Sequence, residues 1–498
     1  MLEAYGQALS FLLSPMTLLL MLGAVIIGLI IGIIPGIGGL IGVALFLPLV
    51  FRMPAETALT FLITFHAVTM TGGSISAILV NVPGTGANAA TLLDGFPMNQ
   101  KGEGARAVGA AVTASTFGGL VPCFLALAMI PLVYRLVIAF RSPEMAMLVL
   151  LGISFIAVLT GRSKTRGLAS GTLGVLISLI GFQNVTGTYR FTLGSEFLYS
   201  GLEIVAMALG LFGLAELFDV LMKGHTSITS TTSKQSLADA LQGALDVWRH
   251  KWVWLQGTII GYIIGVIPGV GAETGTFVAY GQAKKTSKHP ELFGTGIVEG
   301  IIAPESANNA KESGALLTTM AFGIPGSAIF ALFMGAFLMV GVIPGPRMLV
   351  DHLPLALIMI LGIALANLIG GIISLLAAPY LARATSVHID FLFPIILCLI
   401  ITGGYIVRNT MMNVVAVIIL GLLGLLMKRY DFSRPAMLLG FVLGQLFENY
   451  VLLSYQVSGP LFFVTPISMA LFAFIVLLFV YPLLKKFFRH WLPRRVRA

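Results

Sequence analysis

Residues 28–38 read GLIIGIIPGIG, and residues 261–271 read GYIIGVIPGVG. Every glycine and proline of the first stretch has a counterpart in the second. Glycines four residues apart let membrane helices approach closely, whereas a proline followed by glycine interrupts a helix. Because the whole pattern occurs twice, it predicts one broken helix in each of two related halves of the chain.

The composition places these breaks in a membrane. Of 498 residues, 57% are hydrophobic and 10% are charged, against about 25% charged residues in an ordinary soluble domain. This excludes soluble enzymes, nucleic-acid-binding proteins and disordered proteins. The formal net charge of +9 is explained by basic loops on the cytoplasmic side of a membrane.

Apolar runs long enough to cross a bilayer predict an all-α polytopic membrane protein with about 10 to 14 membrane segments. Some of these segments are expected to be re-entrant. The runs cover residues 17–50, 57–80, 104–140, 144–160, 166–182, 198–220, 252–281, 296–345, 354–378, 387–405, 410–427, 435–453 and 461–484. A polar, Ser/Thr-rich stretch at 222–250 separates the two halves.

A second Pro-Gly pair follows each copy of the first motif, in Val82-Pro83-Gly84-Thr85 and in Ile324-Pro325-Gly326-Ser327. Later loops that correspond between the halves have opposite charge bias. This predicts two repeats of inverted topology. The expected organisation is a first repeat at 1–221, a cytoplasmic linker at 222–250, a second repeat at 251–453, and an extra span with a basic tail at 454–498.

Basic residues predict the orientation. The linker region contains Lys223, Lys234, Arg249 and Lys251, and further basic residues follow the last span. Both regions are therefore expected in the cytoplasm, including the C-terminus. The N-terminus has no Lys or Arg before Arg52 and is placed outside.

The helix breaks predict a binding site for a carboxylate. A half-helix that starts near the middle of the membrane presents a partial positive charge and unpaired N–H groups. Polar residues near the second breaks and on the segment between them are the candidates for substrate binding. They are Asn81, Pro83, Gly84, Thr85, Gly86, Asn88, Asn308, Asn309, Lys311, Ser313, Pro325, Gly326 and Ser327.

Charged residues inside a membrane protein are candidates for function. Lys311 could be the counter-charge of an anion, or the neutralising partner of Glu305 or Glu312. His66 is interpreted as a structural polar residue rather than a proton relay. Glu273, Glu299 and Glu305 could carry a coupling H⁺ or Na⁺, or could lie at the membrane surface. The helix-break and ion-coupling candidates comprise these three glutamates together with Pro35, Gly36, Gly38, Gly39, Pro268, Gly269 and Gly271.

Other chemistry has little support in the sequence. It contains no Walker-type phosphate-binding loop, no nucleophile elbow and no ligand spacing for a resident metal ion. We therefore expect neither an enzyme nor a cofactor, and transport driven by an ion gradient or by another subunit. Na⁺ at the helix breaks is the only metal ion considered.

The motifs together resemble the large membrane subunit of tripartite tricarboxylate transporters, the TctA family. The resemblance rests on the stretch at 28–38, on Asn81-Val82-Pro83-Gly84-Thr85-Gly86 and on the run from Ala303 to Ala310. It covers residues 15 to 480.

The resemblance implies a bacterial inner-membrane carrier that imports a carboxylate, such as citrate, by symport with Na⁺ or H⁺. It also implies a small TctB-like membrane subunit and a periplasmic TctC-like binding protein as partners. The alternatives are a stand-alone carboxylate carrier and, from another class, a membrane-embedded enzyme or a channel. An elevator-like movement of the broken helices against the spans at 144–220 and 387–484 is the expected mechanism.

Overall fold

The computed structural model describes residues 2–34, 38–50, 53–159, 164–223, 236–267, 272–381 and 389–491. The chain forms two compact units. The first contains residues 1–137 and 203–430, and the second contains residues 138–202 and 431–498. Each unit therefore takes segments from both of the halves proposed above, and the boundaries of those halves remain a prediction.

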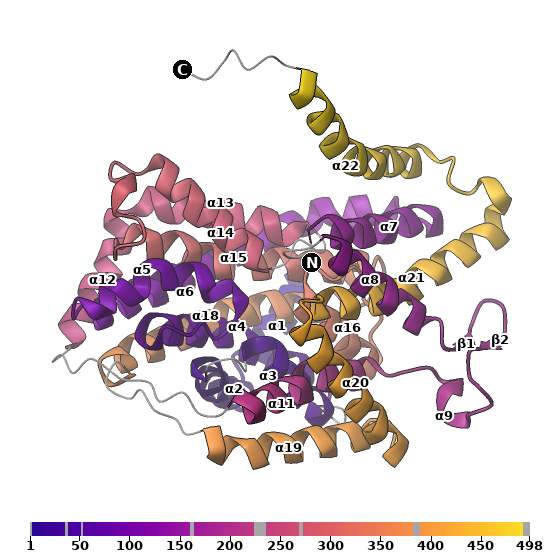
Figure 1. The fold of residues 1–498 in the computed structure, drawn as a ribbon, viewed down its shortest axis with the longest axis horizontal. Helices are drawn as coiled ribbons and strands as arrows, with labels where there is room; N and C mark the ends of the chain where they lie inside the picture. The colour runs from indigo at the N-terminus through magenta and orange to yellow at the C-terminus, as the bar shows by residue number, and fades with distance from the viewer. Residues whose placement is uncertain are drawn as a thin grey trace. The chain divides into compact units, whose positions relative to one another are not determined.

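The first unit is helical throughout its described residues (Figure 1). Its helices are α1 (Leu2–Leu12), α2 (Pro15–Ile33), α3 (Gly38–Phe46), α4 (Ala55–Val80), α5 (Ala89–Gln100), α6 (Gly104–Ile138), α10 (Ile204–Ala208), α11 (Ala215–Lys223), α12 (Leu237–Arg249), α13 (Lys251–Val266), α14 (Ala272–Thr286), α15 (Glu299–Phe322), α16 (Ala328–Met339), α17 (Met348–Asp351), α18 (Leu353–Leu381), α19 (Ile389–Ile406) and α20 (Met411–Arg429).

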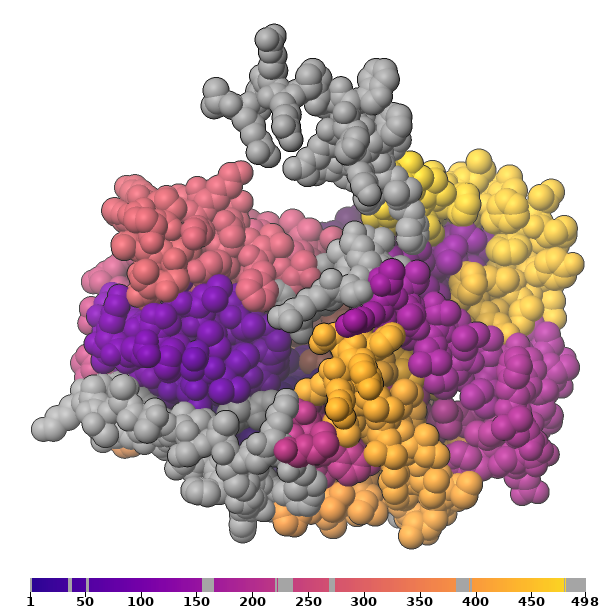
Figure 2. All heavy atoms as spheres, in the orientation of Figure 1, coloured from indigo at the N-terminus to yellow at the C-terminus, as the bar shows by residue number. Residues whose placement is uncertain are grey.

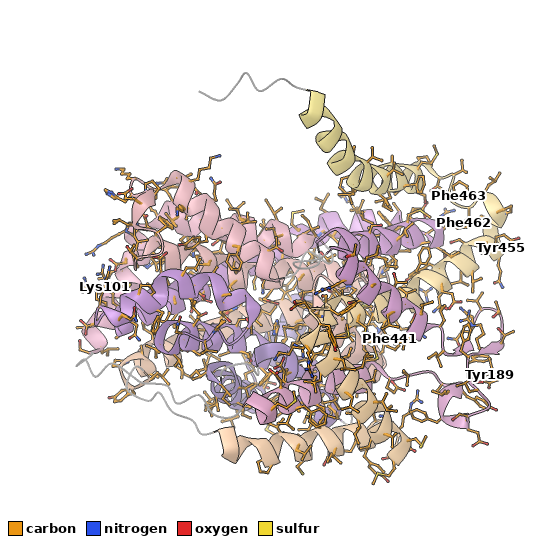
Figure 3. All side chains as sticks on the ribbon, in the orientation of Figure 1. Lys101, Tyr189, Phe441, Tyr455, Phe462 and Phe463 are labelled. Atoms are coloured by element: carbon orange, nitrogen blue, oxygen red, sulfur yellow. The ribbon has the colours of Figure 1, made fainter. Side chains whose placement is uncertain are left out.

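The second unit adds helices and one short hairpin. Its elements are α7 (Ser142–Leu159), α8 (Lys164–Ser178), β1 (Gly181–Gln183), β2 (Thr188–Arg190), α9 (Glu196–Tyr199), α21 (Arg434–Ser458) and α22 (Pro466–Trp491). The strands are antiparallel, and Phe182 pairs with Tyr189, which Figure 3 labels on the hairpin. Arg190 forms an ion pair with Glu448 of α21. The hydrogen bond to Glu448 raises the pKa of Arg190, so this link stays charged.

Six helices of the described residues are long and apolar enough to cross a membrane. They are Pro15–Ile33, Ala55–Val80, Gly104–Ile138, Leu353–Leu381, Met411–Arg429 and Arg434–Leu461. Shorter apolar helices accompany them, including Ala328–Met339. The predicted fold class, an all-α polytopic membrane protein, is confirmed.

Two close helix pairs contain the opening glycine motifs. In the first, a Cβ atom at Gly32 of α2 would lie 2.5 Å from the carbonyl oxygen of Thr69 in α4. In the second, a Cβ atom at Gly265 of α13 would lie 2.1 Å from the carbonyl oxygen of Lys311 in α15. Only glycine permits this approach of two backbones. The glycines therefore position α4 and α15, the two helices that contain most of the buried polar residues described below.

The core of the first unit surrounds α15. Every residue from Gly300 to Ala321 is buried, although this segment contains two glutamates, a lysine and two asparagines. Figure 1 shows α15 beside α13 and α14, and α4 packs against it from another side. Burial of so many polar groups is costly unless each finds a partner.

Part of the polar stretch at 222–250 is helical. Residues 237–249 form helix α12, which begins with a capping box between Ser236 and Asp239. Hydrogen bonds from the Ser236 side chain and backbone lower the pKa of Asp239, so this cap is ionised at neutral pH. The long apolar run at 104–140 is one helix, α6, with Pro122 and Pro131 inside it.

Candidate functional site

Glu305 of α15 is completely buried and is held by hydroxyl groups. Ser74 of α4 donates a hydrogen bond of 2.5 Å to its Oε2 atom, and Thr91 of α5 donates one to its Oε1 atom. Asn88 donates to the Ser74 hydroxyl at 2.8 Å. Among the described residues no cationic side chain forms an ion pair with Glu305. This carboxylate therefore has polar partners but no charge that balances its own.

The chain reaches this position through a capped turn. Asn88 accepts a hydrogen bond of 2.6 Å from the Thr85 hydroxyl and donates to the carbonyl oxygen of Met70 at 3.1 Å. Thr85 and Asn88 form a capping box at the short 3-10 helix Gly86–Asn88 that leads into α5. The predicted candidates Thr85 and Asn88 thus fix the start of the helix that carries Thr91.

Glu312, two turns further along α15, has the opposite electrostatic setting. Its Oε1 atom accepts a hydrogen bond of 2.6 Å from the ammonium group of Lys311. Its Oε2 atom lies 2.7 Å from Nε2 of His66 in α4. All three side chains are buried. The charges of Lys311 and Glu312 balance each other. Of the two interpretations of Lys311 given above, this geometry agrees with the one in which Lys311 neutralises a glutamate, and that glutamate is Glu312.

Two aromatic rings lie beside His66 in this triad. The His66 ring lies with its centroid 6.0 Å from Phe330 and 5.9 Å from Phe333, both in α16. The other ring nitrogen, Nδ1, has no hydrogen-bond partner among the described residues. A Cβ atom at Gly39 would lie 3.2 Å from it. The apolar surroundings strengthen the interaction between His66 and Glu312, because little water competes for them.

Two asparagines lie between the glutamates on α15. Asn309 donates a hydrogen bond of 2.7 Å to Asn367 of α18, and its own amide oxygen has no partner. Asn308 approaches Glu305, but neither of its amide atoms makes a hydrogen bond of good geometry. Unsatisfied buried amides are rare, so these two mark positions where a ligand or water could bind.

Asp94 fastens the beginning of α15. Its Oδ1 atom accepts hydrogen bonds from the backbone N–H groups of Gly294, Gly296 and Ile297 at 2.9, 2.8 and 3.1 Å. The hydroxyl of Tyr280 donates to its Oδ2 atom at 2.8 Å. A buried aspartate that accepts four such hydrogen bonds orders the loop before α15. We therefore interpret Asp94 as a structural residue and not as part of the binding site.

The two Pro-Gly turns are built in matching ways. Helix α4 ends at Asn81 and α15 at Gly323, both in the left-handed conformation, with φ of 59° and 64°. A Cβ atom at Gly84 would lie 2.6 Å from the carbonyl oxygen of Gly32. One at Gly326 would lie 3.1 Å from that of Gly265. Each turn thus packs against the glycine motif that precedes it in the chain.

Most of this chain matches a known protein family. Residues 18–439 match the model of the tripartite tricarboxylate transporter TctA family. The chain belongs to the TctA family. This is a family of transporters, not of enzymes, and its members work in tripartite systems with other subunits. The chain is accordingly the large subunit of such a system and a multi-pass membrane protein.

Two relatives of this TctA-family chain are described as uncharacterized proteins. One is an uncharacterized 52.8 kDa protein in the TAR-I ttuC' 3' region of Agrobacterium vitis, 32% identical over 464 residues, or 93% of this chain and 92% of the relative. Another, in the TAR-II ttuC' 3' region of the same organism, is 33% identical over 214 residues, or 42% of this chain and 88% of the relative. No solved structure matches.

Several predicted site residues of the TctA-family chain lie at the first helix breaks. Gly38 and Gly39 begin α3, and a Cβ atom at Gly38 would lie 2.6 Å from the carbonyl oxygen of Gly84. The two breaks of the first half therefore meet. Pro35, Gly36, Pro268, Gly269 and Gly271 lie outside the described residues. So does the side chain of Glu273, although its backbone belongs to α14.

The remaining predicted residues are spread more widely. Glu299 lies at the start of α15, where it contacts His250 at 3.0 Å and Ser287 at 2.6 Å, apart from the Glu305 cluster. Ser313 contacts the Cys123 sulfur at 3.1 Å. Pro325 and Ser327 flank Gly326 in the second turn, and Pro83 and Gly86 flank the first.

Sequence reasoning left out or undervalued some of the participants. Ser74 and Thr91 are not among the predicted site residues, because a hydroxyl group in a membrane helix usually bonds to its own backbone. Ser74 does this as well, to Met70. Asn367 of α18 accepts a hydrogen bond from Asn309. No sequence motif surrounds Asn367 that could have pointed to this role. Their shared signal is a polar residue within an apolar run, which is too common to single them out.

Proposed function

We propose that this chain is the permease subunit of a binding-protein-dependent carrier that imports a carboxylate together with Na⁺ or H⁺. In the proposed system a small TctB-like membrane subunit accompanies it in the bacterial inner membrane, with the C-terminus in the cytoplasm. A periplasmic TctC-like protein delivers the substrate, which is citrate or another carboxylate. The support for this proposal is family membership together with the polar residues around α15.

The observation that carries the proposal is the contrast between two buried glutamates on one helix. Glu312 is balanced by Lys311 at 2.6 Å, whereas the described partners of Glu305 are all uncharged. An uncompensated carboxylate buried in a membrane protein is expensive. A coupling cation that arrives with the substrate would remove this cost, so we assign cation coupling to Glu305.

The carboxylate is proposed to bind near the two Pro-Gly turns. Helices α5 and α16 begin just after these turns, and their first N–H groups and positive dipole ends favour an anion. The unpartnered Nδ2 group of Asn308 offers the substrate carboxylate a further hydrogen-bond donor, whereas the unpartnered oxygen of Asn309 is suited to a hydroxyl group or a cation. In this scheme the ammonium group of Lys311 divides its interaction between Glu312 and the substrate. His66 gives Glu312 a second partner, which leaves more of the Lys311 charge for the substrate.

Transport then requires the site to open alternately to both sides. We propose an elevator-type cycle in which α4, α15 and the turns that follow them move as one element across the membrane. The tight glycine contacts of α2 with α4 and of α13 with α15 support movement as a block. The alternative function is a stand-alone carrier that needs no binding protein.

The test is uptake by proteoliposomes that contain the chain, its small membrane subunit and its binding protein. A radiolabelled carboxylate that the binding protein binds should accumulate when an inward Na⁺ or H⁺ gradient is imposed, and should not accumulate without one. Lys311→Ala and Thr85→Ala should reduce uptake. Gly281→Ala is the control, because nothing lies within 4 Å of the added methyl group.

Other results would reject parts of this scheme. Full uptake by the chain alone would favour the stand-alone carrier. Flux that does not saturate with substrate would indicate a channel. Accumulation that is indifferent to both cation gradients would remove the coupling proposal.

A further inference from the structure

Helix α12 (Leu237–Arg249) presents an apolar stripe that stays about half exposed in the described structure, although the Trp248 ring at its end also contacts Phe117 of α6. Its members are Leu237, Leu241, Leu245 and Trp248, exposed by 40%, 48%, 56% and 47%. They follow one another at intervals of three or four residues and so share one side of the helix. The neighbouring exposed side carries Gln242 and Arg249. A helix with this division is suited to an interface between water and an apolar phase.

The opposite side of α12 is fixed to the rest of the first unit. A Cβ atom at Gly243 would lie 1.9 Å from the carbonyl oxygen of Arg106 in α6, so the two backbones touch. Asp246 forms ion pairs with Arg106 at 2.7 Å and with Arg249 at 3.1 Å. The apolar stripe is therefore held in one orientation and cannot be buried by rotation of the helix.

The contacts of α12 place it at the boundary of the membrane. Ala240 shares a buried cluster with Ala105 and Ala378. Ala105 lies in the first turn of α6, and Ala378 lies in the last turn of α18. Both helices are long and apolar enough to span a membrane. Because α12 packs where one span begins and another ends, it lies at the level where hydrocarbon gives way to water.

The residues that follow the stripe fit that level. Trp248, Trp252 and Trp254 are three of the four tryptophans of the chain, and tryptophan is enriched at membrane interfaces. Trp254 donates a hydrogen bond of 3.3 Å to the carbonyl oxygen of Ala114. Lys251 lies 6.0 Å from the ring centroid of Trp252. Aromatic rings with basic side chains beside them match a phospholipid headgroup region.

The surface around α12 supports lipid as the partner. Figure 2 shows the α5–α6 segment and the segment of α13–α14 forming one continuous face. Lys101 projects from the turn between α5 and α6 (Figure 3), and Arg249 is exposed at the end of α12. Ile259 and Ile263 of α13 are exposed apolar residues as well.

We propose that α12 is an in-plane membrane anchor, whose Leu237–Trp248 stripe inserts into the headgroup and upper acyl region of a phospholipid bilayer. The segment between the two halves would then be attached to the membrane surface rather than extending into the cytoplasm. Transport activity is not needed for this binding, so the proposal stands or falls independently of the proposed function.

Spin-label accessibility in the full-length chain tests the anchor. Leu241→Cys and Gln242→Cys are compared in a Cys398→Ser background, since Cys123 is buried. The two labelled positions are neighbours and both are exposed, but they face different sides of α12. The chain is reconstituted into mixed phosphatidylcholine–phosphatidylglycerol vesicles, and collisions with membrane-soluble O₂ and water-soluble nickel chelate are measured.

The expected result is several-fold preference for O₂ at position 241 and for the nickel chelate at position 242. Leu245→Cys should behave as Leu241→Cys does, which guards against an artefact of one label. Nickel access at both 241 and 245 equal to that at 242 would overturn the proposal. Dipolar broadening between labels at position 241 would also overturn it, because it would identify a second copy of the chain as the partner.

Discussion

The hydroxyl group of Ser74 donates a hydrogen bond of 2.5 Å to the carboxylate of Glu305, although the two residues are 231 positions apart in the chain. Glu312, on the same helix as Glu305, is instead paired with Lys311 and His66. Two glutamates with equal burial thus have different charge environments. Each glutamate is therefore a control for the other when one of them is substituted.

Glu305→Gln should uncouple transport without harming the fold. The amide has nearly the shape of the carboxyl group and carries no charge. One of the two hydroxyls, Ser74 or Thr91, keeps an acceptor, the other can accept a hydrogen bond from the amide N–H group, and the cation loses its partner. We expect gradient-driven uptake to fall by about tenfold or more, the effect of losing about 1.4 kcal/mol. The melting temperature of the purified protein should not fall. A variant that still accumulates substrate at the wild-type rate would remove Glu305 from the coupling step.

Glu312→Gln, unlike Glu305→Gln, should reduce the thermal stability of the protein. It leaves the Lys311 ammonium buried without its counter-charge, and breaking a buried ion pair from one side costs about 3 to 5 kcal/mol. Thermal unfolding in detergent should therefore begin at a lower temperature than in wild type and in Glu305→Gln. Adding Lys311→Met should recover part of the loss, since no unpaired charge remains. An additive further loss in the double variant would contradict the pairing.

Gly265→Ala tests the close contact between α13 and α15. The added methyl group would lie 2.1 Å from the backbone oxygen of Lys311, and the backbone cannot move aside as a flexible side chain could. We expect a loss of stability of about 1 to 3 kcal/mol, typical of overpacking. Gly281→Ala, in an open position of α14, should be neutral or stabilising. Equal thermal stability of the two variants would argue against the contact.

Asp94→Ala should loosen the loop before α15. It removes the acceptor of three backbone N–H groups and of the Tyr280 hydroxyl, and each buried donor left unpaired costs about 1 to 3 kcal/mol. Hydrogen exchange of residues 293–298 should become faster. Asp94→Asn retains one carbonyl oxygen and should lie between the alanine variant and wild type. Unchanged exchange in the alanine variant would show that the loop is ordered by other contacts.

Much of the fold could be predicted because membrane helices are specified by local composition. The apolar runs, the interruption between α2 and α3, and the Pro-Gly turns after α4 and α15 all follow from residues that lie close together in the chain. Helix α12 was harder to predict, because Ser and Thr surround a short amphipathic segment. Its capping box and the spacing of Leu237, Leu241 and Leu245 were the signals that identify it.

The candidate site was only partly predictable. Lys311, Glu305 and Asn308 could be selected because polar residues are rare in this chain. Their partners could not be assigned, since Ser74, Thr91 and His66 come from other helices and look like ordinary polar residues in a span. Glu299 resembles Glu305 in the sequence, yet it lies with His250 and Ser287 at the start of α15.

The sequence by itself determined that this is a helical membrane protein with glycine–proline breaks at matching places in two stretches, and its motifs identified the family. These properties depend on hydropathy and backbone geometry, which act over a few residues. Only the tertiary structure decided that Glu312 is neutralised by Lys311 while Glu305 is not. Electrostatic balance depends on distances of a few ångströms between helices, and no pattern along a single chain contains those distances.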